Sequence, residues 1–217
     1  MFTAILALAT LSLVWVAALQ WNTLEKTDET LRAAQRPWIK YSDIQIASPL
    51  TYNENGMNIT LRFFLKNTGT SPAQNVFPHV FITSNMRNLL DPGEQRRKCE
   101  AVRQRPARAI EAGFTYFPGD DPIAQDIGVS IPKEEIENAI ALWRTDLPFV
   151  FPVIMGCIND RFPFGAGESH QTGFIFRLSH IVGGPPNPAL VGIDTSLGDI
   201  PQSDLRLTIN YIGSYAD

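Results

Sequence analysis

The feature that most constrains this chain is an apolar segment without a charged residue, which runs from Phe2 to Leu19. As a helix rising about 1.5 Å per residue it would be about 27 Å long, close to the hydrocarbon thickness of a bilayer. We therefore predict a transmembrane helix over residues 1–21, with residues 2–19 in contact with the lipid bilayer. Trp15 and Trp21 are predicted to anchor it at the membrane interface, where tryptophan is enriched.

A cleaved secretory signal peptide is the alternative to an anchor. Such a peptide has a basic start, an apolar stretch of about 7–15 residues and a small-x-small cleavage site. Here no basic residue precedes Phe2, the apolar segment is longer, and no clean cleavage motif precedes Gln20. These observations favour an anchor that stays in the mature protein.

Residues 22–36 are predicted to continue the helix as a short polar stalk. The segment is rich in helix formers, and its Leu24 and Leu31 are one heptad apart, which is too little to establish a coiled coil. Pro37 ends the predicted helix because its ring clashes with the preceding turn. Residues 37–217 are long enough for one domain with its own core.

Strand patterns dominate residues 37–217. The clearest strand covers 57–66, where every second residue is apolar: Met57, Ile59, Leu61, Phe63 and Leu65. A similar alternation in 39–48 has a slip that suggests a bulge. About seven or eight such segments, joined by Gly- and Pro-rich turns, predict an antiparallel β-sandwich with one or two inserted helices.

One of these helices is predicted to begin at Pro132, a residue suited to the first helical position. Its apolar residues recur at helical spacing and would pack on the sheet: Ile136, Ala139, Ile140 and Trp143.

The stretch NTGTSPAQNV, residues 67–76, separates the strand 57–66 from the next, 76–83. Asn67 and Gly69 tolerate a positive φ, which would let the backbone leave the first strand. No residue in the stretch is a good nucleophile, base or charged ligand, so we predict a structural corner. Pro78 predicts an edge position or a bulge in the second strand.

The two cysteines, Cys99 and Cys157, bear on the compartment of the protein. They lie far apart without a CxxC motif, so they could form one long-range disulfide in an oxidising compartment or remain two unrelated thiols. The cations that follow the anchor would by themselves keep the domain in the cytoplasm, yet long C-terminal domains translocate largely regardless of nearby charge. We favour the disulfide and a periplasmic domain.

Basic residues concentrate in a single segment of the chain: Arg96, Arg97, Lys98, Arg103, Arg105 and Arg108. One interpretation is a solvated helix face or loop, and the other is an anion-binding patch for lipid headgroups or an acidic partner. The net charge of −4 provides no general attraction to nucleic acid, which we therefore do not expect as a partner.

No sequence motif indicates catalysis or a cofactor. The three histidines lack zinc-like spacing and there is no GxSxG, so we predict no metal, no cofactor and no catalytic residue. The remaining enzyme hypothesis is a hydrolase with a site near residues 156–172, built from Asp160, Ser169 and His170. Ser169 and His170 are adjacent, however, and strand neighbours point to opposite faces.

Four motifs carry a resemblance to known proteins: RPWIKY (36–41), RFFLKNTGTSPAQNV (62–76), GCINDRF (156–162) and HQTGFIFRL (170–178). With the anchor and stalk, they make the chain resemble a large class of single-span membrane proteins of proteobacteria, especially rhizobial types, over nearly its whole length. The resemblance implies an immunoglobulin-like β-sandwich that serves as an adhesive or accessory module. The basic segment around Cys99 has no counterpart in that class.

The sequence thus leads to a functional hypothesis: a binding or accessory module without catalysis. We expect it to be anchored in the bacterial inner membrane by a single span and to bind another membrane or periplasmic protein through its periplasmic domain. The alternatives are a small subunit of a larger membrane complex and the hydrolase.

Overall fold

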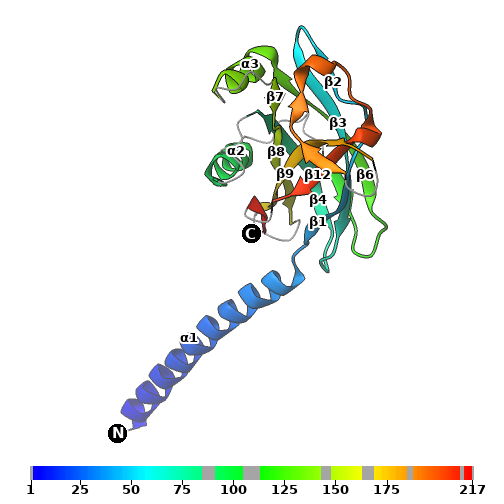
Figure 1. Ribbon diagram of the computed structural model, residues 1–217. Helices are drawn as coiled ribbons and strands as arrows, with labels where there is room; N and C mark the ends of the chain where they lie inside the picture. The colour runs from blue at the N-terminus through cyan, green and yellow to red at the C-terminus, as the bar shows by residue number, and fades with distance from the viewer. Residues whose placement is uncertain are drawn as a thin grey trace.

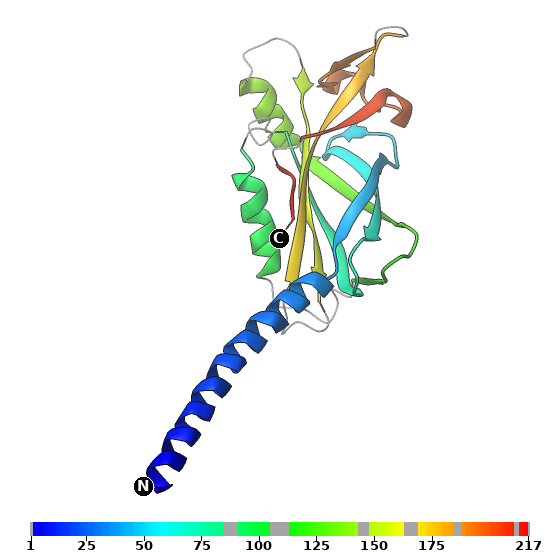
Figure 2. The same ribbon diagram turned by 90° about the horizontal axis from the view of Figure 1, so that it is seen from below.

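A long N-terminal helix projects from a β domain (Figures 1 and 2). The computed structural model describes residues 2–84, 91–104, 113–142, 148–162, 169–184, 188–210 and 213–216. Helix α1 runs from Phe2 to Gln35 and includes nearly all of the predicted stalk. It ends two residues before Pro37, as expected from the clash of a proline ring with the preceding turn. The other two helices of the described residues are α2 (Gly93–Arg103) and α3 (Lys133–Leu142).

The first sheet has β3 at its centre. On one edge β3 pairs with β1 and β2, and on the other it pairs with β6 from Gly56↔Pro132 to Leu65↔Ile123, always antiparallel. The strands of this sheet are β1 (Ile39–Ile46), β2 (Thr51–Asn53), β3 (Gly56–Asn67) and β6 (Ile123–Pro132).

The second sheet is larger and is ordered β10-β9-β8-β4-β5, with β12 and β13 also paired to β9. Its strands are β4 (Ala73–Thr83), β5 (Phe114–Tyr116), β8 (Val153–Arg161), β9 (Ser169–Val182), β10 (Ala189–Val191), β12 (Leu205–Ile209) and β13 (Tyr215–Ala216). A two-stranded sheet and two short 3₁₀ helices complete the described domain: β7 (Phe149–Val150), β11 (Ile193–Asp194), η2 (Thr195–Leu197) and η3 (Gln202–Asp204). The fold is mainly β, with antiparallel sheets.

Both large sheets contribute to one hydrophobic core. All five apolar residues predicted to share a face of the 57–66 strand are buried. The ring of Phe63 from the first sheet lies 5.3 Å from that of Phe174 on β9, and Tyr41 on β1 meets the same ring edge-on. Ile136 and Ala139 of α3 are buried as predicted, whereas Trp143 lies outside the described residues.

Irregularities predicted from the sequence occur in two strands. The register of β1 shifts between Tyr41 and Asp43, which confirms the predicted bulge. In β4 the register shifts between Gln74 and Phe77, directly before Pro78. Beyond Val76, β8 is the only described strand that pairs with β4, so the other edge of β4 is unpaired at Pro78. A proline, which lacks an N–H, is tolerated at such an edge.

The corner between β3 and β4, residues 68–72, lies at the junction between α1 and the β domain, and residues 73–76, which were predicted to belong to the corner, are part of β4. The buried Asn67 side chain accepts hydrogen bonds from the backbone N–H of Trp38 (3.3 Å) and Gly69 (2.9 Å) and donates to two carbonyls. The prediction that Asn67 and Gly69 adopt a positive φ is wrong, because only Asn75 of this stretch does so. Gly69 is needed for a different reason: a Cβ atom there would lie 2.5 Å from the carbonyl oxygen of Arg36.

Candidate functional site

Helix α2 carries most of the predicted basic patch. Arg96, Arg97, Lys98 and Arg103 all lie on it, whereas Arg105 and Arg108 fall outside the described residues. The helix begins where the side chain of Asp91 accepts a hydrogen bond from the N–H of Gly93, at 2.8 Å. It contains four cations and two carboxylates, an excess of two positive charges.

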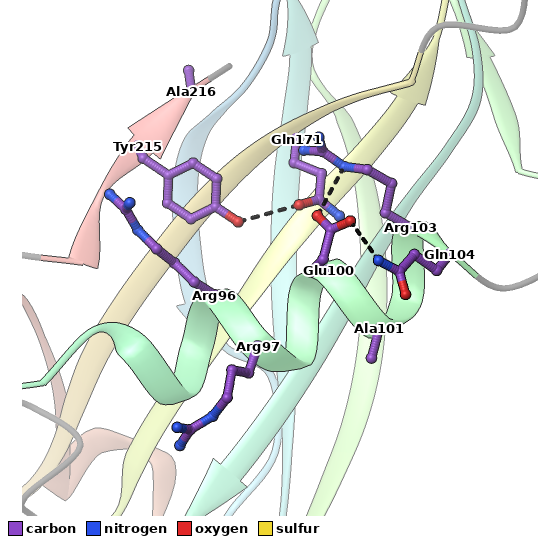
Figure 3. Close-up of a pocket in the computed structure, with 9 residues that line it drawn as sticks. All are labelled: Arg96, Arg97, Glu100, Ala101, Arg103, Gln104, Gln171, Tyr215 and Ala216. Atoms are coloured by element: carbon purple, nitrogen blue, oxygen red, sulfur yellow. Dashed lines mark hydrogen bonds and ion pairs between the residues drawn. The ribbon is translucent and has the colours of Figure 1, made fainter.

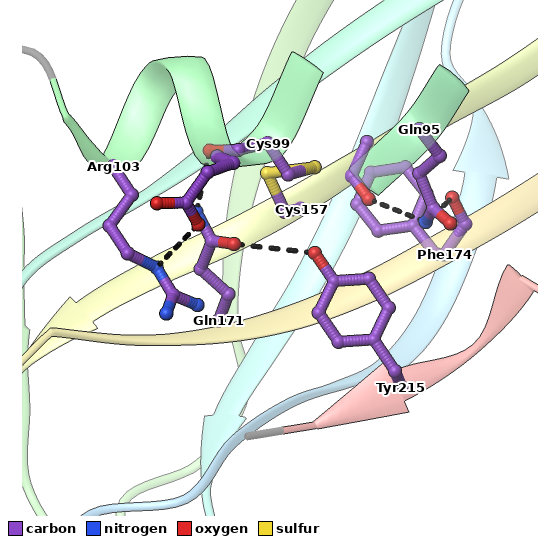
Figure 4. The surroundings of a disulfide bond; sticks show 9 residues. Gln95, Cys99, Arg103, Cys157, Gln171, Phe174 and Tyr215 are labelled. Carbon is purple, nitrogen blue, oxygen red and sulfur yellow. Dashed lines mark hydrogen bonds and ion pairs between the residues drawn. A yellow bond between two sulfur atoms is a disulfide. The ribbon is translucent and has the colours of Figure 1, made fainter. Parts of the chain in front are cut away.

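A disulfide between Cys99 and Cys157 joins α2 to the outer face of the second sheet (Figure 4). The two Cα atoms are 5.9 Å apart, within the usual range for a disulfide, and both residues are fully buried. The pairing closes a loop of 58 residues.

Two buried glutamines fix the helix on either side of the disulfide. The Gln95 side-chain amide donates to the carbonyl oxygens of Gly156 (3.0 Å) and Phe174 (2.8 Å) on adjacent strands. In the opposite direction, the Gln171 side chain on β9 donates to the carbonyl oxygen of Cys99 at 2.8 Å. Helix α2 is therefore held by a covalent bond and three buried hydrogen bonds, which limits its movement over the sheet.

The short strand β13 lies beside α2 because β9 has a glycine at the right position. Tyr215 pairs with Gly173, and a Cβ atom at Gly173 would lie 2.1 Å from the Tyr215 ring. Because Gly173 has no side chain, the Tyr215 ring can lie against the sheet. The Tyr215 hydroxyl donates to the Gln171 side chain at 3.3 Å, which orients the ring.

An open groove of about 680 Å³ lies between α2 and β13 (Figure 3), and we call it the α2–β13 groove. Its polar lining residues are Arg96, Arg97, Glu100, Arg103, Gln104, Gln171 and Tyr215. The guanidinium of Arg96 lies over the Tyr215 ring, 5.3 Å from its centre, within the range of a cation–π interaction. Sequence reasoning missed Gln171 and Tyr215, which carry no local signal of a site.

The carboxylates of α2 pair with some of its cations. Glu94 forms ion pairs with Arg97 and, at 3.8 Å, with Lys98; the hydrogen bond from Arg97 lowers the pKa of the Glu94 carboxyl. Arg97 points away from Tyr215 in Figure 3, and the ammonium of Lys98 lies over the ring of Phe81 at 5.1 Å. The predicted patch is thus divided, and only part of it faces the groove.

The residues of the hydrolase hypothesis are only partly brought together. The register of β8 and β9 places Asp160 opposite His170 and Arg161 opposite Ser169. Asp160 is buried, and the Nδ1 atom of His170 lies 3.5 Å from the Arg36 guanidinium at the end of α1. Because Ser169 and His170 are consecutive in β9, their side chains leave opposite faces of the sheet. This arrangement does not place the serine beside the histidine.

Neither a metal centre nor a membrane span stands out in the described part of the chain. No group of three or more histidine, cysteine, aspartate or glutamate side chains is close enough to hold a metal ion there. Among the same residues, no helix is apolar over a sufficient length to qualify as a bilayer span. The side chains of residues 2–9, 11 and 12, which belong to the predicted span, lie outside the described set. Trp15 and Trp21 are described, and both are exposed.

A comparison of the chain with protein families, with curated proteins and with solved structures finds no match. The α2–β13 groove must therefore be interpreted from its own geometry. A helix with excess positive charge, attached to the sheet and facing an aromatic ring across an open groove, is suited to binding an anionic group.

Proposed function

We propose that this protein is a membrane-anchored binding module without catalysis, whose immunoglobulin-like β domain lies on the periplasmic side of a bacterial inner membrane. Its recognition surface is the α2–β13 groove, and its partner is another membrane or periplasmic protein. The observation that carries the proposal is the attachment of α2 by the Cys99–Cys157 disulfide, Gln95 and Gln171 beside an open groove that contains Arg96.

The exposed apolar residues of α1 support the membrane anchor. Leu13, Val14, Trp15 and Leu19 are each at least half exposed on a helix that projects away from the β domain (Figure 2). Leaving such side chains in water forfeits about 1.5–3 kcal/mol each relative to burial. A bilayer around residues 2–19 would bury them on all sides of the helix.

The disulfide supports the periplasmic location. Disulfides persist in oxidising compartments such as the bacterial periplasm and are rare in the cytosol. Both cysteines of the chain take part in the bond, and it lies in a buried position beneath α2.

The test is purification of the full chain from bacterial membranes in mild detergent, followed by identification of co-purifying proteins. We expect a companion protein that is lost from the Arg96→Glu variant. The matched control is Lys133→Glu, which reverses a cation on α3 and should retain the companion. A chain that purifies as a clean monomer without companions would contradict the proposal, and so would equal retention by both variants.

Two measurements test the proposed membrane anchor and the periplasmic location of the β domain. After a carbonate wash the chain should remain in the membrane fraction with its N-terminus intact, and a mature form that starts near Gln20 would indicate a cleaved signal peptide. Protease added to spheroplasts should degrade the β domain, and full protection of the domain would place it in the cytoplasm.

A further inference from the structure

We infer that the α2–β13 groove binds a carboxylate of an acidic peptide segment, and that Glu100 occupies the position of that carboxylate in the free protein. This inference rests on the proposed function, because it assigns a ligand class to the same groove.

Glu100 lies between Arg96 and Arg103, two of the arginines that line the groove (Figure 3). One of its carboxylate oxygens accepts a hydrogen bond from the Gln104 side chain at 2.9 Å, and the other lies 3.8 Å from Nε of Arg103. The latter distance is that of an ion pair without a hydrogen bond. The Glu100 side chain is 51% exposed, so its carboxylate can turn into solvent.

An incoming carboxylate could improve on these contacts. Arginine and a carboxylate form paired hydrogen bonds of about 2.7–2.9 Å when their planes are aligned. The Arg103–Glu100 pair keeps the longer separation of 3.8 Å, whereas Arg97 and Glu94, at the same spacing on α2, form a hydrogen bond. A carboxylate that arrives from outside can instead align with the guanidinium plane.

Arg96 supplies another cation of the groove. It is exposed, and within the described chain it has no ion pair with a carboxylate, only the ring of Tyr215 beneath its guanidinium. The ring restrains the arginine in a position facing the groove and leaves its N–H groups available. Arg96 and Arg103 are seven residues apart, or two helical turns, so together they could contact acidic side chains about 10 Å apart.

The stalk favours a peptide over lipid headgroups as the source of the anion. If residues 2–19 lie in the bilayer, α1 continues for residues 20–35 before the β domain begins, a rise of about 24 Å. The Debye length at physiological ionic strength is about 8 Å, so the potential of anionic lipids is largely screened at that height. A protein segment can reach the groove where a headgroup cannot.

The experiment measures binding of a fluorescein-labelled decaglutamate peptide to the full chain in neutral detergent, by fluorescence anisotropy at low and physiological salt. Arg96→Ala should weaken binding about tenfold or more, the range of a lost charge-assisted hydrogen bond. Glu100→Gln should strengthen it about two- to fivefold, because the internal competitor for Arg103 loses its charge. Lys133→Ala on α3 should leave binding unchanged.

The effect of Glu100→Gln decides the inference, since a residue with only a structural role would weaken binding or leave it unchanged when replaced. Either of those results, with unaltered circular dichroism, overturns the inference. It is equally overturned if vesicles of phosphatidylglycerol or inorganic phosphate bind in an Arg96-dependent manner while the peptide does not. If a companion protein still depends on Arg96 but decaglutamate fails to bind, the proposed function stands and the ligand class is wrong.

Discussion

Removal of the Cys99–Cys157 disulfide is expected to destabilise the β domain by several kcal/mol. The bond closes a loop of 58 residues. In the chain-entropy description, opening such a loop returns about 14 cal/mol/K to the unfolded chain, or about 4 kcal/mol at 25 °C. Stabilities of whole domains are about 5–15 kcal/mol, so this is a large fraction of the total.

The loss should appear as a shift of the unfolding midpoint. Replacing both cysteines by alanine removes the bond without leaving an unpaired buried thiol, and Ala101→Ser, on an exposed position of the same helix, is the matched control. Urea unfolding of the full chain in neutral detergent, followed by near-ultraviolet circular dichroism, gives the free energy of unfolding. We expect the double variant to lose about 2–5 kcal/mol and the control to change by less than about 0.5 kcal/mol.

Two results would refute this reasoning. If the double variant unfolds at the same urea concentration as the native chain, the loop constraint has no thermodynamic effect. If both cysteines of the folded, unreduced protein react with an alkylating reagent, the bond is absent in the isolated protein. A change of gel mobility on adding reductant is the positive counterpart of the second measurement.

Three further substitutions test other parts of the structure. Gly69→Ala should cost about 1–3 kcal/mol because its Cβ would press on backbone at the α1 junction, whereas Gly128→Ala, with nothing within 4 Å of the added Cβ, should be nearly neutral in thermal unfolding. Burial raises the pKa of the Tyr116 hydroxyl above its unfolded value of about 10. The protonated hydroxyl therefore contributes to the free energy of unfolding below about pH 10, and this contribution is lost as the pH rises through the higher folded pKa. In the Tyr116→Phe variant, the free energy of unfolding should therefore fall less steeply with pH above about 10. An unchanged slope would show that other groups cause the loss of stability at alkaline pH. Arg62→Ala should leave the unfolding midpoint unchanged at physiological salt, because its ion pair with Asp126 is exposed; a clear shift would show that the pair is more strongly coupled than its exposure suggests.

Much of the fold could be predicted from local patterns. The alternation in 57–66 predicted which residues of β3 are buried, and the helical spacing after Pro132 predicted α3. These predictions succeed because strand and helix periods act over a few residues and depend on the contrast between apolar and polar side chains. The bulge in β1 was visible in the same way, as a slip in alternation.

Other features could not be predicted from the sequence. Gly69 was attributed to backbone freedom, yet its role is to let the chain at Arg36 pass close by. The basic patch was treated as one cluster, but α2 turns Arg97 and Arg96 to different sides. In both cases the role of the residue depends on which distant segments pack against it, and a local sequence pattern carries no information about those segments.

The sequence by itself determined the elements: an apolar N-terminal segment, a helix that ends before Pro37, alternating strands, and two cysteines that were able to pair. Only the tertiary structure decided the site. Gln171 and Tyr215 reach the groove from strands far along the chain from Arg96, through the register of β9 with β13 and through a glycine that admits the Tyr215 ring. Strand periodicity fixes which face a side chain takes, but the pairing of distant strands fixes its neighbours, and that pairing is set by the free energy of packing the whole core.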